Sequence, residues 1–220
     1  SPAVDFGDAP DASIGTEAGN YNTTAEDYGP SHTITQALYM GTTVDGDDGT
    51  LQDVTANADD VNPSFSSDED GLTNPTIDLV FSASEQPTID VNVTNTTGAA
   101  ATLFGWIDYN TDGIFDNTTE RTQVAVPDGT NGSVATLAFP TAPENYLGET
   151  FARFRLSTDA AAANPTGAAS DGEGEDYIIT MSNKLYLQGT SENDSVRIWP
   201  GTPGETLHRI DINGVTNYVD

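Results

Sequence analysis

The sequence contains no cysteine, and only two of its 220 residues are histidine. Disulfide bonds and thiolate metal sites are therefore excluded, and a zinc site, which normally uses several Cys or His ligands, is disfavoured. Cysteine nucleophiles are excluded too, and Ser31 beside His32 is a sequence adjacency rather than a catalytic triad. An extracellular domain of this composition has to be stabilised by something other than sulfur.

Basic residues are almost as scarce. The chain has 35 acidic residues against 6 Lys and Arg, for a formal net charge of -29, and the segment Ser1 to Glu120 has no Lys or Arg. Nucleic acids and anionic membrane surfaces require a basic footprint, so neither is expected as a partner. Self-repulsion on this scale opposes compaction unless positive charge is bound. Divalent cations would supply that charge, and a salt-adapted acidic surface is the alternative.

Long apolar runs are also missing, so we expect no insertion into a membrane. Hydrophobic residues make up 35% of the chain, which at 220 residues is enough for one sizeable domain. The N-terminal residues Ser-Pro-Ala-Val-Asp lack the charged and apolar regions of a signal peptide. They are either a mature end or a cut from a longer protein.

The clearest motif is an alternation of oxygen-bearing side chains over residues 108–120. It follows the spacing of calcium loops of the D-x-[DN]-x-[DN]-G type, in which every second side chain turns inward onto one hard cation. The expected ligands are Asp108, Asn110, Asp112, the carbonyl of Ile114 and Asp116.

This loop differs from an EF-hand. The twelfth position, which should be a bidentate Glu, is Thr119, and Glu120 follows one residue late. The flanking residues favour strands over helices. We therefore predict a calcium loop between two strands, with an Asx-rich turn as the alternative. The missing ligand is expected from another acidic cluster, with residues 68–70 as the first candidate.

Further acidic residues are clustered within the first 75 residues, which otherwise have a loop-like composition. A structureless segment of that length is improbable inside a compact domain, so it is either disordered or ordered by ligands. Clustering favours cation sites, although a solvated loop explains each single cluster equally well. The additional predicted calcium ligands here are Asp5, Asp8, Asp45, Asp47, Asp68, Glu69 and Asp70.

From Thr76 onward the pattern changes to the period of two that is typical of strands. A Pro-Asp-Gly-Thr-Asn-Gly turn at residues 127–132 predicts a hairpin between its flanking strands. We predict an all-β antiparallel sandwich of immunoglobulin-like architecture with long metal-ordered loops, and Trp106 in its core. The predicted strands are residues 76–81, 88–95, 100–107, 121–126, 133–139, 150–157 and 177–181.

A second acidic motif, Asp-Gly-Glu-Gly-Glu-Asp-Tyr, covers residues 171–177. Its four carboxylates, of which Asp171, Glu173 and Glu175 are the predicted calcium ligands, either surround a calcium ion or pair with Arg153 and Arg155 on the preceding predicted strand. The sequence does not decide between these two arrangements.

Several separate motifs occur in a characteristic order along the chain, at residues 5–11, 29–32, 68–71, 105–115, 153–158, 165–167 and 171–177. With these motifs, the chain from about Val4 to Met181 resembles the GEVED domain of large bacterial surface and secreted proteins. Gly174 stands where the family motif has Val, a change expected to loosen a turn. The resemblance implies a non-catalytic cell-surface role and carries over no catalytic residues.

The C-terminal tail differs in sequence from the rest of the chain. We therefore predict one domain over residues 1–183 and a β-rich tail over residues 184–220. Within the domain, residues 1–75 are loop-rich and residues 76–183 contain the strands. Residues 185–198 weakly resemble a hemolysin-type calcium-binding repeat. An Asn-Gly hairpin is predicted within residues 210–216. The tail either begins a following module or adds to the sheet edge of another copy to form filaments.

Together these features predict a non-catalytic, calcium-stabilised structural or adhesive module outside the cell or on its surface. Its expected partners are calcium ions, neighbouring domains and copies of itself. Two alternatives stay open. A glycoside hydrolase would use paired carboxylates, which spacing alone does not separate from metal ligands. A carbohydrate-binding module would hold glycans on exposed aromatics, with Tyr186 and Trp199 as candidates.

Overall fold

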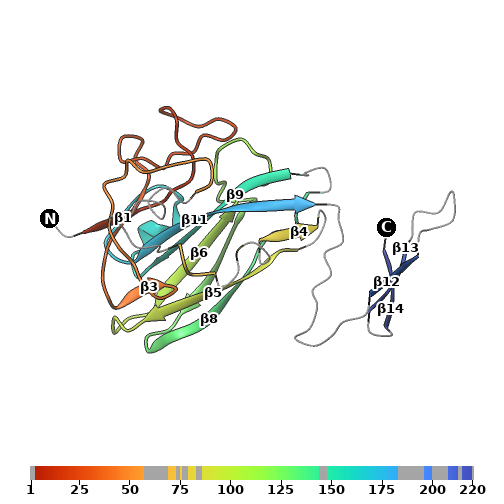
Figure 1. Ribbon diagram of the computed structural model, residues 1–220. Coiled ribbons are helices and arrows are strands. Elements are labelled where there is room, and N and C mark those ends of the chain that lie inside the picture. The colour runs from red at the N-terminus through yellow and green to blue at the C-terminus, as the bar shows by residue number, and fades with distance from the viewer. Residues whose placement is uncertain are drawn as a thin grey trace. The chain divides into compact units, whose positions relative to one another are not determined.

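The chain forms two compact units, residues 1–182 and residues 183–220. Strands dominate both, so the protein is all-β, as predicted (Figure 1). The computed structural model describes residues 3–56, 69–72, 75, 79–82, 86–143, 148–182, 196–199, 208–212 and 215–219, and all structural statements here refer to them.

Two sheets form a sandwich in the first unit. Their strand orders are β3-β5-β8 and β4-β11-β9-β6-β7, and neighbours are antiparallel except β4 and β11. From β5 to β11 the strands are distributed between the sheets like strands B, C, C′, E, F and G of an immunoglobulin-like sandwich. The strands are β3 (Leu38–Met40), β4 (Val80–Ser82), β5 (Thr88–Asn95), β6 (Ala101–Ile107), β7 (Arg121–Val126), β8 (Thr130–Ala138), β9 (Gly148–Ser157) and β11 (Glu173–Ser182).

The main core lies between these two sheets and follows from the alternation of side chains along each strand. Leu103, Phe154 and Ile179 project from β6, β9 and β11 toward Ile89 and Val91 of β5, and all five are buried. The intervening residues of β6, β9 and β11 therefore point to the outer face of the five-stranded sheet.

A further layer covers that outer face. It consists of a small sheet of β1 (Val4–Phe6), β2 (Pro30–Thr33) and β10 (Gly167–Ala169), the 3-10 helix η1 (Ala160–Ala163) and the loops of the N-terminal part (Figure 1, red to orange). Trp106 is fully buried, which confirms it as a core residue, but it belongs to a second apolar cluster under this layer.

The predicted hairpin between residues 121–126 and 133–139 is wrong. β7 pairs with β6 and β8 pairs with β5, so the turn carries the chain from one sheet to the other. Thr130 N donates to Pro127 O at 3.3 Å, and Gly129 has a φ of 84°, which closes a tight corner. Val126 and Leu137 face the same core from opposite sheets. The alternation of apolar and polar residues along each strand would be the same in a hairpin, so this pattern alone could not distinguish the two arrangements.

The second unit contains β12 (Val196–Trp199), β13 (His208–Ile212) and β14 (Val215–Val219), paired antiparallel in that order. The pairing of Ile212 with Val215 confirms the predicted Asn-Gly hairpin. Most of the hemolysin-like segment, residues 185–195, lies outside the described residues. None of the helices searched among the described residues is long and apolar enough to cross a membrane.

Candidate functional site

The acidic motif at residues 171–177 continues into a central strand. β11 begins at Glu173, four residues before the predicted start, and lies between β4 and β9. Gly174 is thus a strand residue inside a sheet, which corrects the expectation that it loosens a turn. Glu173, Glu175 and Asp176 are each at most 1% exposed. Alternation directs the two Glu side chains to one face and Asp176 to the other.

On the core side, the two glutamates bind backbone groups from distant segments. Glu173 Oε2 accepts a hydrogen bond from Met40 N of β3. Glu175 Oε1 accepts from Gly71 N at 3.0 Å. Both donors belong to the part of the chain that the sequence indicated as loop. In this structure the two predicted calcium ligands therefore fasten that part to β11.

On the opposite face, the N-terminal segment docks against the same strand. Gly174 N donates to Asp5 Oδ2 at 2.7 Å, and Ala9 N donates to Asp176 Oδ2 at 2.9 Å. Between them, a Cβ added to Gly7 would collide with the carboxylate of Asp176. The Asp-Phe-Gly-Asp motif near the N-terminus thus has a structural reason, since only glycine allows this close approach.

Asp176 forms a buried, bidentate ion pair with Arg153. Arg153 Nε and one terminal nitrogen donate to the two carboxylate oxygens at 2.7 and 2.8 Å. The other guanidinium N–H groups donate to Thr23 Oγ1 and to the backbone oxygens of Asn22 and Pro165. All five N–H groups of Arg153 have acceptors. An arginine does pair with this motif, through Asp176.

Arg155 and His32 form a second buried group on the same face. Arg155 Nε donates to His32 Nε2 at 2.9 Å, and His32 Nδ1 lies 2.9 Å from Asp171 O. Nδ1 therefore carries the proton of a neutral imidazole. Burial and the adjacent Arg155 lower the pKa of His32 to about 3. Burial, together with the charge of Arg153, lowers the pKa of Arg155 to about 9.

The other predicted ligands of the N-terminal part are dispersed. Asp47 Oδ2 accepts from Phe6 N at 2.8 Å, and Asp70 Oδ1 accepts from Thr42 N at 2.9 Å. Asp171 caps a turn by accepting from Thr158 N at 2.9 Å. Asp8 is buried, Asp45 and Glu69 are half-buried, and Asp68 lies outside the described residues. Over the described parts of the chain, three or more Asp, Glu or His side chains do not gather into a metal-binding group.

The predicted calcium loop begins with a buried carboxylate at the end of β6. Asp108 is fully buried, and its Oδ2 accepts from Tyr21 Oη at 2.8 Å and from Gly113 N at 3.0 Å. Its Oδ1 is enclosed and has no hydrogen-bond donor among the described residues. Burial raises the pKa of Asp108.

The remaining predicted ligands of the loop lie nearer the surface. Asn110 and Asp112 are exposed, and each accepts a hydrogen bond from the backbone N–H two residues later. Asp116 Oδ1 accepts from Thr118 N at 2.8 Å. These are Asx turns, the alternative considered for this sequence. Gly113 has a φ of 81°, and its position allows no Cβ because the backbone of Glu17 lies against it.

Glu120 closes the loop, a role that sequence reasoning missed. It is 2% exposed, and its two oxygens accept from Tyr109 N at 2.9 Å and Asp116 N at 2.8 Å. Burial, and to a smaller extent the charge of Asp108, raise the pKa of Glu120 to about 7. In the sequence, the only indication of this role was that Glu120 follows directly after the twelfth position of the calcium-loop pattern.

Comparison with known families agrees with these features. Residues 102–180 match the family model of the GEVED domain, a range that runs from β6 into β11 and includes both the loop and the acidic strand. The family comparison does not confirm the hemolysin-type resemblance of the tail. A search of the curated proteins found no match to this chain. Over residues 102–180, this chain is therefore similar to the GEVED domain.

Proposed function

We propose that this chain is a non-catalytic, calcium-stabilised structural or adhesive module of a larger bacterial protein that is secreted or displayed on the cell surface. The GEVED match supports a surface or secreted module. The observation that carries the calcium part is the enclosed Asp108 Oδ1, which has no donor among the described residues, in a loop with calcium-binding spacing.

An enclosed carboxylate oxygen without a donor is unfavourable, because burial removes the water that would otherwise solvate it. A calcium ion satisfies several oxygens at once and accepts six to eight ligands in flexible geometry. Asp108 and Glu120 already lie at the two ends of the loop, both buried. A cation between them would compensate two carboxylates.

The proposed ligand set keeps the predicted spacing and replaces the twelfth-position residue. It uses the second lone pairs of carboxyl and amide oxygens whose first lone pairs accept backbone N–H groups in the Asx turns. Since the loop joins strands β6 and β7, bound calcium stiffens the connection rather than opening a helix pair. The proposed ligands are Asp108, Asn110, Asp112, Asp116, Glu120 and the carbonyl of Ile114. Since the carboxylates of this set do not gather into a metal-binding group in this structure, the proposal requires calcium to draw them together.

The buried carboxylates of β11 support a non-catalytic role. Glu173, Glu175 and Asp176 are at most 1% exposed. Each accepts hydrogen bonds from the protein itself. A glycosidase requires two carboxyl groups that reach the bond to be cleaved. These groups serve instead to join the N-terminal part to the sheet.

Thermal unfolding with calcium and with chelator tests the calcium proposal. A ligand that binds only the folded state adds about 2.7 kcal/mol of stability at a hundredfold excess over its Kd. We expect calcium to raise the Tm of the full chain, and Asp108→Asn and Glu120→Gln each to abolish the rise. Glu26→Gln removes one exposed charge elsewhere and should retain it.

Magnesium and sodium chloride at matched ionic strength are the controls for general screening. Equal Tm increases with all three salts would contradict a specific site, as would the absence of any increase with calcium.

We further propose that copies of the chain associate by strand addition. β8 is the outermost strand of its sheet, has nine residues and contains no charged side chain. Phe139 N donates to Pro87 O, which places alternate backbone groups, including those of Thr136, on the free edge. Thr136→Pro removes an outward N–H and should reduce the mass measured by light scattering. A wild-type chain that stays monomeric at high concentration in calcium would refute association.

A further inference from the structure

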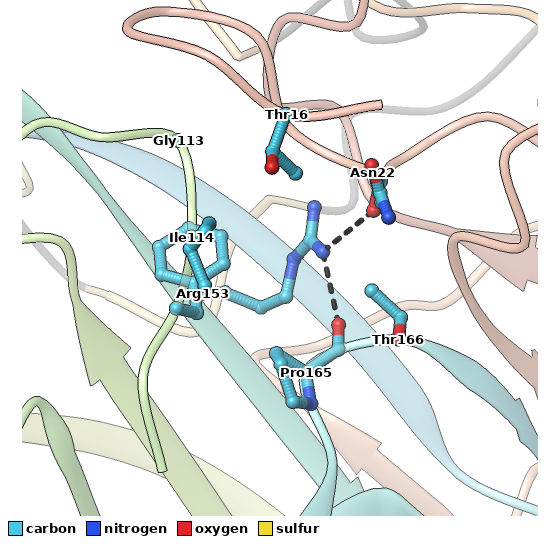
Figure 2. A pocket seen from close by; sticks show the side chains of 8 residues that line it. Thr16, Asn22, Gly113, Ile114, Arg153, Pro165 and Thr166 are labelled. Carbon is cyan, nitrogen blue, oxygen red and sulfur yellow. Dashed lines mark hydrogen bonds between the residues drawn. The ribbon is translucent and has the colours of Figure 1, made fainter. Parts of the chain in front are cut away.

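A pocket of about 240 Å³ lies in the first unit between the loop 108–120 and the segment that leads to β10 (Figure 2). Three segments far apart in the sequence line it, so it is a product of the fold rather than of one loop. Its lining includes Thr16, Asn22, Ile114, Pro165 and Thr166, together with Phe115 and Arg153.

The pocket offers no charged partner to a ligand. Arg153 is 1% exposed, and Figure 2 shows its guanidinium bound to the backbone oxygens of Asn22 and Pro165. Its remaining N–H groups donate to Asp176 and Thr23. The residues that line the pocket include no Asp or Glu. The net charge of -29 also repels anions. A neutral ligand fits these conditions.

The walls of the pocket are amphipathic. One side has the Ile114 side chain, which is 48% exposed. The Phe115 ring is only 5% exposed, because Tyr21 stacks on it with centroids 4.9 Å apart and the Arg153 guanidinium lies 5.0 Å from its centroid. The other side has Thr16, Thr166 and Asn22, whose side chains carry neutral hydroxyl and amide groups (Figure 2). A sugar ring combines a C–H face, which packs on apolar surfaces, with hydroxyls, which pair with neutral polar groups.

Asn22 supplies an independent indication of a ligand. Its Oδ1 is enclosed and has no hydrogen-bond donor among the described residues. A turn of the amide toward the pocket would allow a ligand hydroxyl to donate to this oxygen, which removes an unsatisfied acceptor. A cavity of this size is smaller than pockets for drug-sized ligands and accommodates a single ring.

We propose that this pocket binds one neutral hexose-type unit of a glycan, with the ring against Ile114 and its hydroxyls toward Asn22, Thr16 and Thr166. This activity goes beyond the structural role proposed above and does not require the calcium site. It would give the module a specific attachment to glycosylated surfaces.

Nuclear magnetic resonance of the full chain tests the proposal with methyl glucoside, methyl galactoside and N-acetylglucosamine at millimolar concentration, with glucuronate as the anionic control. We expect at least one neutral sugar to shift the amide resonances of Asn22, Ile114 and Thr166, and glucuronate to leave them unchanged. The sugar titrations are carried out both in calcium and in chelator. Sugar-induced shifts in both conditions would show that sugar binding does not depend on the proposed calcium site.

Two variants localise the binding. Asn22→Ala and Ile114→Ser should each weaken the sugar about tenfold or more, equivalent to about 1.4 kcal/mol. Val134→Ser, which removes an exposed apolar side chain on β8, is the matched control and should bind like the wild type. Absence of shifts with all neutral sugars, preferential binding of glucuronate, or equal affinity of Ile114→Ser and the wild type would overturn the proposal.

Discussion

Arg153 is the residue at which three parts of the first unit meet. Its side chain joins Asp176 of β11, the N-terminal segment at Asn22 and Thr23, and the loop at Pro165. Its guanidinium also lies over the Phe115 ring, 5.0 Å from the centroid. A planar group with five donors suits this position, because a lysine ammonium has three donors and no fork geometry.

We therefore expect Arg153→Lys to lower the free energy of unfolding by about 1 to 3 kcal/mol for each buried acceptor left without a donor, since an ammonium has three donors where the guanidinium has five. Urea denaturation followed by tryptophan fluorescence measures the change. Arg121→Lys is the matched control, because Arg121 makes one hydrogen bond to Ala163 O and should cost less. Equal losses in the two variants would contradict the role assigned to Arg153.

The buried side chain of His32 should make the stability of the fold depend on pH. Its pKa is about 3 in the folded protein against 6.5 for an unperturbed histidine, so the unfolded state binds more protons between these values. Stability from this group is present above pH 6.5 and falls as the pH decreases toward 3, by up to about 1.4 kcal/mol per pH unit.

Denaturation curves recorded at several pH values within that window should show a shallower slope for His32→Gln than for the wild type. Gln retains an acceptor near Arg155 Nε but does not titrate. Identical slopes would show that His32 does not contribute to the acid sensitivity of the fold.

At the level of elements, substitutions in β11 can distinguish two roles for its acidic residues: hydrogen bonding to the N-terminal part, or binding of a metal ion. Glu175 accepts from Gly71 N and from Tyr177 Oη in this structure. If hydrogen bonding is its role, Glu175→Ala should cost about 1 to 3 kcal/mol for each buried donor left unpaired, and Glu175→Gln much less. Melting curves in calcium and in chelator test this. A loss with Gln as large as with Ala, seen only in calcium, would indicate a metal ligand instead.

The strands that sequence patterns predicted best are those with apolar alternation. β5 and β7 have the predicted bounds, Thr88–Asn95 and Arg121–Val126, because their alternating side chains mark one buried face. β11 was predicted from Tyr177 only. Its first residues, Glu-Gly-Glu-Asp, have low strand propensity, and tertiary hydrogen bonds to β9 and the N-terminal part override it.

The site was predictable to the extent that it is local. The spacing of the loop 108–120 and the acids of residues 171–177 are visible in the sequence. The partners of Glu173 and Glu175 are backbone N–H groups of Met40 and Gly71, which have no side-chain signature. The same holds for His32, whose neighbour Arg155 is 123 positions away. Such pairings follow from the fold and not from any segment.

For the molecule as a whole, the division at residue 182 gives a prediction. The first unit contains both main sheets and both apolar clusters, while the second contains three strands paired with one another. A protein ending at Ser182 should fold with a Tm within a few degrees of the full chain, as measured by circular dichroism. A large loss of Tm would show that the first unit depends on residues 183–220.

The hydrogen bonds from the N-terminal part to β11 also determine when the fold can be completed. Met40 and Glu173 are 133 positions apart, and Asp5 and Gly174 are 169 apart. At a synthesis rate of about 5 to 20 residues per second, the N-terminal part exists for on the order of ten seconds before its anchoring strand has been made. Loop closure over such separations also slows folding. The N-terminal part is therefore synthesised before β11 but reaches its final structure only after β11 has been made.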